Sequence, residues 1–159
     1  MDRVSKTNYY LDIAQTVLER STCLRGKFGA IIVKNDSIVS TGYNGAPRGR
    51  KNCTDIGSCA CGELGAGCPV NNEICRSVHA EANCIISATR EQMLDSTLYL
   101  CGIDAPSGDI KSDTCSCQAC KRLIINAGIS KVIVRSSPTC FISYNVRDWV
   151  LNDDSISGQ

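Results

Sequence analysis

Apolar side chains recur at helical spacing along residues 7–20, at Tyr10, Ile13, Ala14, Val17 and Leu18. This spacing places them on one face of a helix, and Ser5 or Thr7 can cap its start. Two short apolar runs follow, at residues 28–33 and 37–41, on either side of Asn35 and Asp36. Residues of this type form the tight turns between antiparallel strands, so the pattern predicts a β-hairpin.

The second half of the chain alternates between strand-like and helix-like patterns. We expect strands at residues 97–101 and 131–135, and helices at residues 79–90, 117–126 and 146–151. Ser77 is expected to cap the first of these helices, and Gly128 is expected to end the second. The buried face of the first is expected to carry Ala82, Ile85, Ile86 and Thr89. Alternating strands and helices indicate an α/β class.

We expect residues 1–159 to form a single domain, since the chain is long enough for one core and contains no internal repeat. Three segments stand apart from the regular pattern. Residues 50–76 form a cysteine-rich insertion without periodicity, residues 102–114 form a polar insertion loop, and residues 152–159 form a frayed tail.

Basic and acidic residues balance, with 17 Lys and Arg against 16 Asp and Glu. A duplex-DNA-binding protein needs a basic face, so nucleic acid is not an expected partner. No run approaches the ~20 apolar residues of a membrane-spanning helix, so no membrane partner is expected. A local basic cluster suits a phosphate on a small ligand; its members are Arg25, Lys27, Arg48, Arg50 and Lys51.

Cysteine is unusually frequent, with 12 among the 159 residues. The N-terminal sequence MDRVSKTNYYLDIAQ lacks the apolar core of a secretory signal, so we expect a cytoplasmic protein whose thiols stay reduced. In that compartment, clustered cysteines more often bind metal than form disulfides.

The single histidine, His79, lies in SVHAEANC, and CSCQAC at residues 115–120 contains a Cys-x-x-Cys pair. Cys117 and Cys120 fall on one side of a predicted helix, whose N-terminal dipole favours their thiolate forms. One imidazole and two thiolates leave the fourth position of a zinc ion open, as a catalytic zinc requires.

Glu81 follows His79 by two residues, and positions i and i+2 of a helix do not face the same way. We therefore expect Glu81 to line the cavity beside the metal, where it can take and deliver protons. Each motif alone has a simpler explanation: an ordinary polar histidine, a redox cysteine pair, or half of a structural zinc site. Their combination, each at the start of a predicted helix, favours a catalytic zinc centre.

HAEAN at residues 79–83, SCQAC at residues 116–120 and the KRLIINAGISKVIV that follows resemble the zinc-dependent cytidine and deoxycytidylate deaminase superfamily. CLRGKFGAIIVKNDSIVSTGYNGAPRG at residues 23–49 resembles its deoxycytidylate (dCMP) deaminase branch. The resemblance spans roughly residues 7–135 and implies a three-layer α-β-α fold around a mixed sheet of about five strands.

The resemblance also implies hydrolytic deamination of dCMP to dUMP and ammonia, a step of pyrimidine deoxynucleotide metabolism. Zn²⁺ would be held by His79, Cys117 and Cys120, its bound hydroxide would attack C4 of cytosine, and Glu81 would carry the protons. Asn44 would hydrogen-bond the nucleotide, and the backbone amide of Ala80 would meet the pyrimidine.

The resemblance implies that Arg90, on the same predicted helix as His79, binds the 5′-phosphate, since an arginine at the corresponding place in the family is a candidate for this contact and its planar donors suit phosphate. The alternative is a surface arginine that complements the helix dipole. Arg25 and Arg48 are further candidates for a substrate or effector phosphate.

The chain departs from the family pattern in two places. Ser116 stands where relatives have proline before the first cysteine, and we expect it to cap the helix instead. The loop at residues 102–114 is longer than in many relatives, so it could cover the active site or shape nucleotide or subunit contacts. Cys115, beside the site, is expected to fill space, although it could compete for the metal.

Some dCMP deaminases that the chain resembles carry a second, structural zinc near residues 50–76. The expected ligand set is Cys23, Cys53, Cys59 and Cys75, with Cys61 or Cys68 as alternatives to Cys59. The other interpretation of these residues is scattered free thiols. Cys84, Cys101 and Cys140 are expected to fill core space.

The resemblance further implies a homo-oligomer, either a hexamer or a dimer, that dCTP activates and dTTP inhibits. Two other functions remain open. The chain could deaminate another cytosine nucleotide, a nucleoside or a base in nucleic acid, or it could be a non-catalytic, zinc-stapled nucleotide-binding module. Glu81 argues against the module, since a purely structural zinc needs no carboxylate beside it.

Overall fold

The computed structural model describes residues 2–63 and 74–152. Within this part of the chain, five strands form one mixed sheet in the order β2-β1-β3-β4-β5. Their bounds are β1 Gly26–Lys34, β2 Ser37–Tyr43, β3 Thr97–Asp104, β4 Lys131–Arg135 and β5 Phe141–Asn145. β3 and β4 are parallel, and the other neighbouring pairs are antiparallel. The expected mixed sheet is confirmed.

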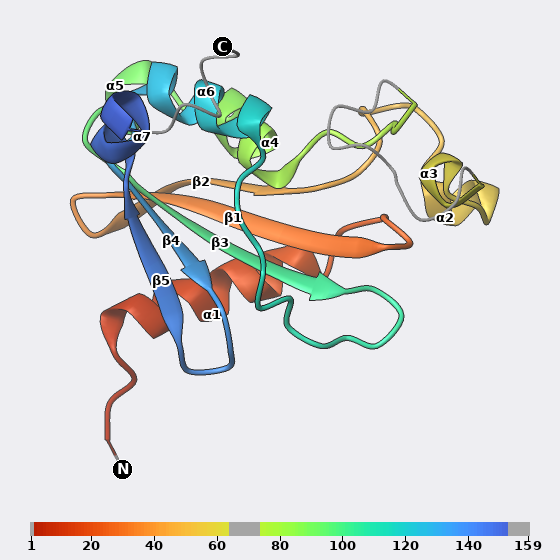
Figure 1. Ribbon diagram of the computed structural model, residues 1–159, viewed down its shortest axis with the longest axis horizontal. Coiled ribbons are helices and arrows are strands. Elements are labelled where there is room, and N and C mark those ends of the chain that lie inside the picture. Colours follow the sequence, from red (N-terminus) through yellow and green to blue (C-terminus); the bar gives the residue numbers. More distant parts are fainter. Residues whose placement is uncertain (1, 64–73, 153–159) are drawn as a thin grey trace.

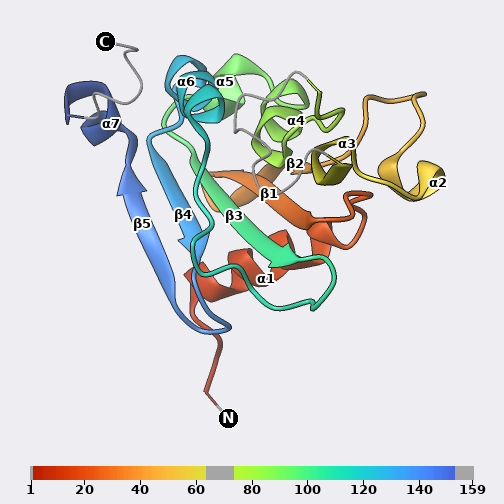
Figure 2. The same ribbon diagram turned by 45° about the vertical axis from the view of Figure 1, so that its right-hand side comes forward.

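Helices lie on both faces of this sheet, which gives three layers (Figure 1). α1 (Lys6–Leu18) packs on one face, and α4 (Ala80–Ile86), α5 (Arg90–Met93), α6 (Gln118–Ala127) and α7 (Val146–Asn152) lie on the other side. The short helices α2 (Cys53–Ile56) and α3 (Ala60–Glu63) lie beyond one end of the sheet (Figure 2). Among the described helices, none has the length and apolarity that a membrane span requires.

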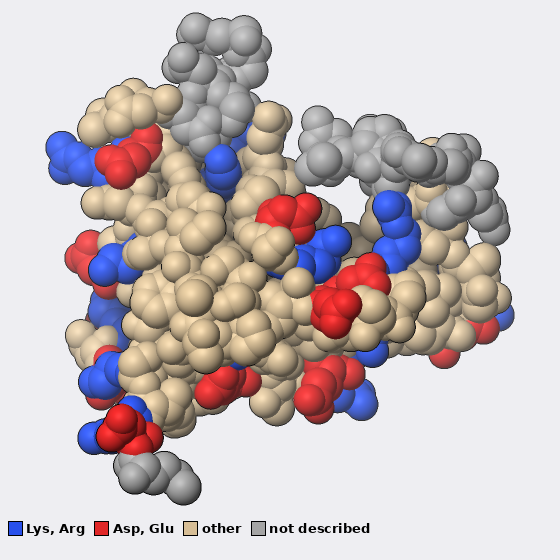
Figure 3. Space-filling model, turned by 60° about the horizontal axis from the view of Figure 1, so that its bottom comes forward, with Lys and Arg blue, Asp and Glu red and all other residues tan. Residues whose placement is uncertain are grey.

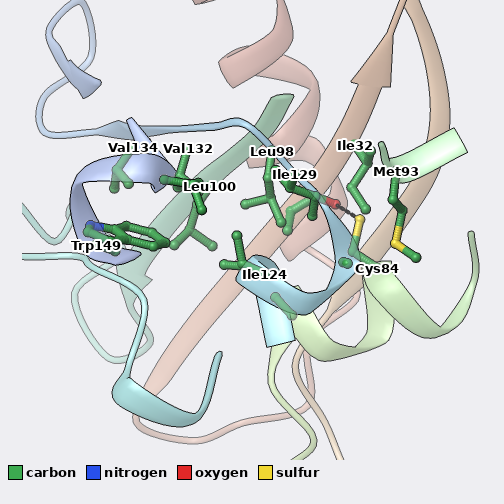
Figure 4. Close-up of a cluster of buried hydrophobic side chains, with 14 residues drawn as sticks. Ile32, Cys84, Met93, Leu98, Leu100, Ile124, Ile129, Val132, Val134 and Trp149 are labelled. Atoms are coloured by element: carbon green, nitrogen blue, oxygen red, sulfur yellow. Dashed lines mark hydrogen bonds between the residues drawn. The ribbon is translucent and has the colours of Figure 1, made fainter. Parts of the chain in front are cut away.

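Successive residues of the strands alternate between two apolar cores. Ala30 and Ile32 of β1 contribute to the core beneath α4 and α6, whereas Ile31 and Val33 face α1. Figure 4 shows the first core, in which strand residues Leu98 and Leu100 meet side chains of the helical layer. A strand covered on both faces is apolar at every position, which explains the unbroken apolar run in this part of the sequence.

The first helix and the hairpin agree with the sequence prediction. The Ser5 hydroxyl caps α1 by accepting a hydrogen bond from the backbone N–H of Asn8 at 3.2 Å. Asn35 and Asp36 both adopt positive φ, 49° and 61°, as a two-residue turn between antiparallel strands requires.

The helix predicted at residues 79–90 is wrong in its cap and its length. His79, not Ser77, is the N-cap, and α4 ends at Ile86. Thr89 then starts α5 with a capping box. Its hydroxyl accepts a hydrogen bond from the backbone N–H of Gln92, and the side-chain oxygen of Gln92 accepts one from the backbone N–H of Thr89. A capping box fixes a new helix start, so the chain turns here instead of continuing.

The predicted buried face of this helix also needs correction. The buried residues of α4 are Ala80, Glu81 and Cys84. Of the four residues predicted to face inward, Ala82 and Ile85 are half-buried, whereas Ile86 is 75% exposed and Thr89 is exposed as well. The sequence pattern assigned Ile86 and Thr89 to the core because it assumed an unbroken helix. The shorter α4 instead turns its first residues inward, which matters for the site below.

Several smaller predictions have mixed outcomes. Cys84 and Cys101 are fully buried as expected, but Cys140 is exposed, because it lies in the turn before β5. β5 was not predicted, since it is an edge strand with mostly exposed side chains and no apolar alternation. Cys68 and the tail beyond residue 152 lie outside the described residues.

Candidate active site

Backbone contacts on both sides fix the position of His79. Val78 exchanges two backbone hydrogen bonds with Gly45, just after β2, with N···O distances of 2.7 and 3.2 Å. His79 itself keeps an extended backbone and precedes the first turn of α4. The imidazole is therefore held where the chain passes from the edge of the sheet into the helix.

α4 lies close to β2 because Gly42 has no side chain. A Cβ at this position would collide with the backbone of α4, at the carbonyl of Ala80 and the N–H of Cys84. The same helix carries His79 at its cap and Glu81 in its first turn. The close approach of the two backbones at Gly42 thus sets the height of His79 and Glu81 above the sheet.

Gly42→Ala is expected to destabilise the fold by about 1–3 kcal/mol, because the extra methyl forces the two backbones apart. It should also reduce zinc binding and kcat per folded molecule, since α4 moves. Gly29→Ala is the matched control, because its Cβ would collide with the backbone of α1 on the opposite face. Thermal unfolding should detect both losses of stability; zinc loss in Gly29→Ala, or an unchanged Gly42→Ala, would contradict this assignment.

The two cysteines are positioned by the start of α6. Cys117 is the N-cap, and its sulfur accepts a hydrogen bond from the backbone N–H of Cys120 at 3.4 Å. The prediction that Ser116 caps this helix is wrong, because Cys117 occupies that position. The predicted end of the helix is confirmed, with Gly128 in the left-handed conformation at its C-cap.

His79, Cys117 and Cys120 converge, with their ligand atoms within 4.8 Å of one another. The His79 Nδ1 lies 3.5 Å from the Cys117 sulfur and 3.4 Å from the Cys120 sulfur. A tetrahedral zinc with ordinary Zn–N and Zn–S bonds would place such atoms about 3.6 Å apart. The three side chains therefore fit a zinc ion, and they leave its fourth position free of these donors.

The electrostatics of the trio favour metal binding. Hydrogen bonds to the sulfur of Cys117 lower its pKa to about 4; the bond from the Cys120 thiol has the larger effect and the bond from His79 the smaller. Cys120, the donor in this hydrogen bond and a buried residue, has a raised pKa. Hydrogen bonding to Cys117 raises the pKa of His79 as well. One thiolate is thus ready for a cation, and binding of Zn²⁺ would displace the proton of the other.

Glu81 is only 5% exposed and lies in the wall of the same cavity as His79. Burial raises the pKa of its carboxyl group, because the charged form loses its hydration. The buried hydroxyl of Ser116, which lacks a well-aligned hydrogen bond to any described residue, lies beside Glu81 and opposes this shift. A carboxyl group whose pKa is raised by burial takes up a proton more readily than an exposed one, which suits a group that must both accept and donate protons.

A cavity of about 660 Å³ adjoins the metal-binding trio. This volume falls in the range of roughly 300–1,000 Å³ typical of small-molecule sites. The wall is formed by the start of β1, the start of α4, the cysteine-rich segment and the loop at residues 102–114. The loop contributes Asp104, Pro106 and Lys111 to the wall. It therefore borders the cavity, as the expectation of a role at the active site or in nucleotide contacts requires.

Most of the predicted substrate-binding residues lie at this cavity. Ala80, Asn44 and Arg25 line it. The side chain of Asn44 is buried and holds β1 in place: its Oδ1 accepts from Ser21 Oγ at 2.6 Å and from the Phe28 N–H at 2.9 Å. Its Nδ2 donates to the Gly26 carbonyl at 2.9 Å, which leaves one N–H for a ligand.

The structure does not bring Arg90 or Arg48 to the cavity. The argument for Arg90 assumed one helix from residue 79 to residue 90, and that helix is broken. The Arg90 guanidinium donates instead to the Asn126 carbonyl at 2.9 Å, in the last turn of α6. Arg48 is exposed and does not line the cavity.

Sequence reasoning missed Lys111 and Phe28 as cavity residues. The length of the loop at residues 102–114 drew attention to that segment, but the lysine within it had no neighbouring motif. Phe28 belongs to the apolar run of β1, so the pattern assigned it to the core. Neither position could be found without the tertiary arrangement.

The fold and the site together indicate a class: an α/β protein with a His-Cys-Cys cluster at a cavity, and a buried glutamate beside it, has the arrangement typical of the zinc deaminases. The family described as the cytidine and deoxycytidylate deaminase zinc-binding region matches residues 4–136. The chain belongs to this family, and zinc is its metal.

Individual relatives agree with this assignment. A deoxycytidylate deaminase of Mycobacterium phage D29 is 34% identical over 135 residues, which cover 84% of this chain and 96% of the relative. One from Schizosaccharomyces pombe is 30% identical over 135 residues, 85% of this chain but 38% of the relative. The chain thus spans about two fifths of the length of that relative and of a similar one from Saccharomyces cerevisiae, where the share is 39%.

A solved structure supports the same fold. The dCMP deaminase of cyanophage S-TIM5, crystallised in complex with dCMP and dUMP, matches with a TM-score of 0.59 and 26% identity. The match covers 99% of this chain and 94% of the cyanophage protein. A cytidine deaminase from Burkholderia pseudomallei, at 14% identity and a TM-score of 0.58, shows the likeness of the fold alone.

Proposed function

We propose that this chain deaminates dCMP to dUMP and ammonia. The observation that carries the proposal is the convergence of His79, Cys117 and Cys120 at a cavity that also exposes Glu81 and has room for a nucleotide. Relatives named deoxycytidylate deaminase support dCMP as the substrate. The match to one of them, from Mycobacterium phage D29, covers 96% of that relative.

In this proposal the residues divide the work of hydrolysis. Zn²⁺ held by the trio would supply Lewis-acid activation of a water molecule. Glu81 would accept one proton from the attacking water and give it to N3 of the cytosine ring, then take the remaining proton from the same oxygen, now bonded to C4, and deliver it to the amino group. The new C4–O bond replaces the C4–N bond, and the amino group leaves as ammonia. The N–H of Ala80, a residue of the cavity wall, would bind the pyrimidine.

The charge distribution favours a small substrate over nucleic acid. Lysine and arginine alternate with aspartate and glutamate across the face seen in Figure 3. The whole sequence carries a formal net charge of +1, with 5% aromatic residues. A protein that binds single-stranded nucleic acid by phosphate contacts and base stacking needs more basic and more aromatic residues along a continuous groove.

A deamination panel of dCMP, CMP, deoxycytidine and cytidine tests the proposal. We expect kcat/KM for dCMP to exceed that for deoxycytidine by at least about 100-fold, since charge-assisted hydrogen bonds to phosphate are each worth roughly tenfold or more. Loss of absorbance of the cytosine ring measures the rate. Equal rates for dCMP and deoxycytidine, or no turnover of either by the zinc-loaded chain, would contradict it.

We propose in addition that Cys23, Cys53, Cys59 and Cys75 bind a second, structural zinc. Cys23, Cys59 and Cys75 line the same cavity, and Cys53 is close enough to all three that they help to raise its pKa, after burial as the main cause. Cys61 and Cys68 remain the alternatives to Cys59 in this set, and Cys68 lies outside the described residues. One zinc or less per chain of reduced protein would refute this proposal.

We propose, finally, that the chain forms a homo-oligomer regulated by dCTP and dTTP. The support is the family resemblance together with exposed apolar side chains on β5 and α7, namely Phe141, Ile142, Val150 and Leu151. Repeating the deamination panel with each triphosphate tests the regulation.

A further inference from the structure

Two cationic side chains line the cavity among the described residues, Arg25 and Lys111. Arg25 immediately precedes β1, and Lys111 lies in the loop at residues 102–114. The two segments are neighbours, because Gly26 pairs with Asp104 at the end of β3. The backbone N–H of Ala105 also donates to the Arg25 carbonyl at 2.9 Å. Both cations therefore belong to one end of the cavity.

The backbone around Lys111 is fixed by hydrogen bonds on both sides. Its N–H donates to the Gly102 carbonyl at 2.9 Å, and its carbonyl accepts from the N–H and the hydroxyl of Thr114 at 3.1 and 2.7 Å. A bridge between Ile103 and Ile110 closes the base of the same loop. The half-buried side chain of Lys111 is thus attached to a backbone that hydrogen bonds hold in place. This reduces the entropy lost when the side chain binds a ligand.

One acidic group faces these cations within the loop. Asp104 also lines the cavity, and its carboxylate accepts from the Ser107 N–H and hydroxyl at 2.9 and 2.8 Å. Those bonds, and then the nearby charge of Lys111, lower the pKa of Asp104, which stays ionised. One anion against two cations leaves this end of the cavity positive, and a phosphomonoester carries about −2 at neutral pH.

We propose that Lys111, with Arg25 beside it, binds the 5′-phosphate of the nucleotide, so that the loop at residues 102–114 selects nucleotides over nucleosides. The proposal rests on the proposed function, because it assumes a nucleotide in this cavity. It replaces Arg90 in that role, since the guanidinium of Arg90 is bonded to the end of α6.

The test compares binding of dUMP and deoxyuridine to the zinc-loaded full chain by titration calorimetry. Lys111→Met is expected to weaken dUMP binding about tenfold or more, because a charged hydrogen-bond donor is lost, with deoxyuridine changed less than about twofold. Arg25→Met should show the same pattern, and Lys111→Arg should keep most of the dUMP affinity. Lys131→Met, which removes an exposed lysine at the start of β4, is the control and should change neither.

The outcomes separate this proposal from the function beneath it. Equal weakening of both ligands by Lys111→Met, or no change in either, would overturn the phosphate role while the deamination of dCMP stands. Strong phosphate-dependent binding of dUMP by a chain that does not turn over dCMP would retain the phosphate site and overturn the proposed function. Thermal unfolding of each variant confirms that the compared proteins are folded.

Discussion

Replacing Glu81 with glutamine is expected to lower kcat for dCMP by roughly 10²–10⁴-fold, because the amide keeps the shape of the side chain but cannot accept or deliver the protons. Zinc content and affinity for dCMP should stay close to those of the unchanged chain. Glu81 is buried at the cavity wall, so no water molecule can readily replace its carboxylate in the same position. Steady-state kinetics with dCMP, together with metal analysis, measure both quantities.

The matched control for this variant is Glu91→Gln. Glu91 is an exposed acid in the first turn of α5, and it does not line the cavity. Its replacement should leave kcat within about twofold, as is usual for surface substitutions. If Glu81→Gln retained a substantial part of the activity, the proton transfers would have to be assigned to another group.

Replacing Cys117 with alanine is expected to abolish zinc binding at the trio and to reduce deamination to background. The sulfur contributes one of three metal ligands and also caps α6 through the N–H of Cys120. Both effects act on the same ion, because an uncapped first turn would displace Cys120 too. Metal analysis and the dCMP assay provide the measurement.

Cys115→Ala is the control, since Cys115 is exposed, stands two residues away and is not part of the trio. It should retain full zinc and activity, in agreement with the expectation that Cys115 is not a ligand. Zinc loss in Cys115→Ala equal to that in Cys117→Ala would contradict the ligand assignment. Any zinc that remains in Cys117→Ala reports on the second set of cysteines.

The metal site could be predicted from the sequence because its spacing is local. Cys117 and Cys120 lie one helical turn apart, and His79 and Glu81 fall at a helix start in the same way, so short-range geometry already placed each pair. The hairpin was predictable for a similar reason, since Asn35 and Asp36 favour the positive φ that the turn needs. The close approach of α4 to β2 at Gly42, and the meeting of the starts of α4 and α6 at one site, are visible only in three dimensions.

Arg25 was a phosphate candidate from the sequence, but the role proposed for Lys111 could not be predicted, because it depends on two tertiary features. The capping box at Thr89 ended the helix that was meant to carry Arg90 toward the substrate. Lys111 reaches the cavity only because the end of β3 pairs with the start of β1, far away in the sequence. β5 escaped for a different reason: an exposed edge strand has no apolar alternation to detect.

The most direct test is a zinc-restoration assay of dCMP deamination. The purified chain is stripped of metal, zinc is added back in steps, and dUMP is measured at each step. Activity should be absent without zinc and return as zinc occupies the site formed by His79, Cys117 and Cys120. In Glu81→Gln it should stay absent at every zinc level. Full activity in the stripped chain, or none after zinc is restored, would contradict a catalytic zinc centre in this protein.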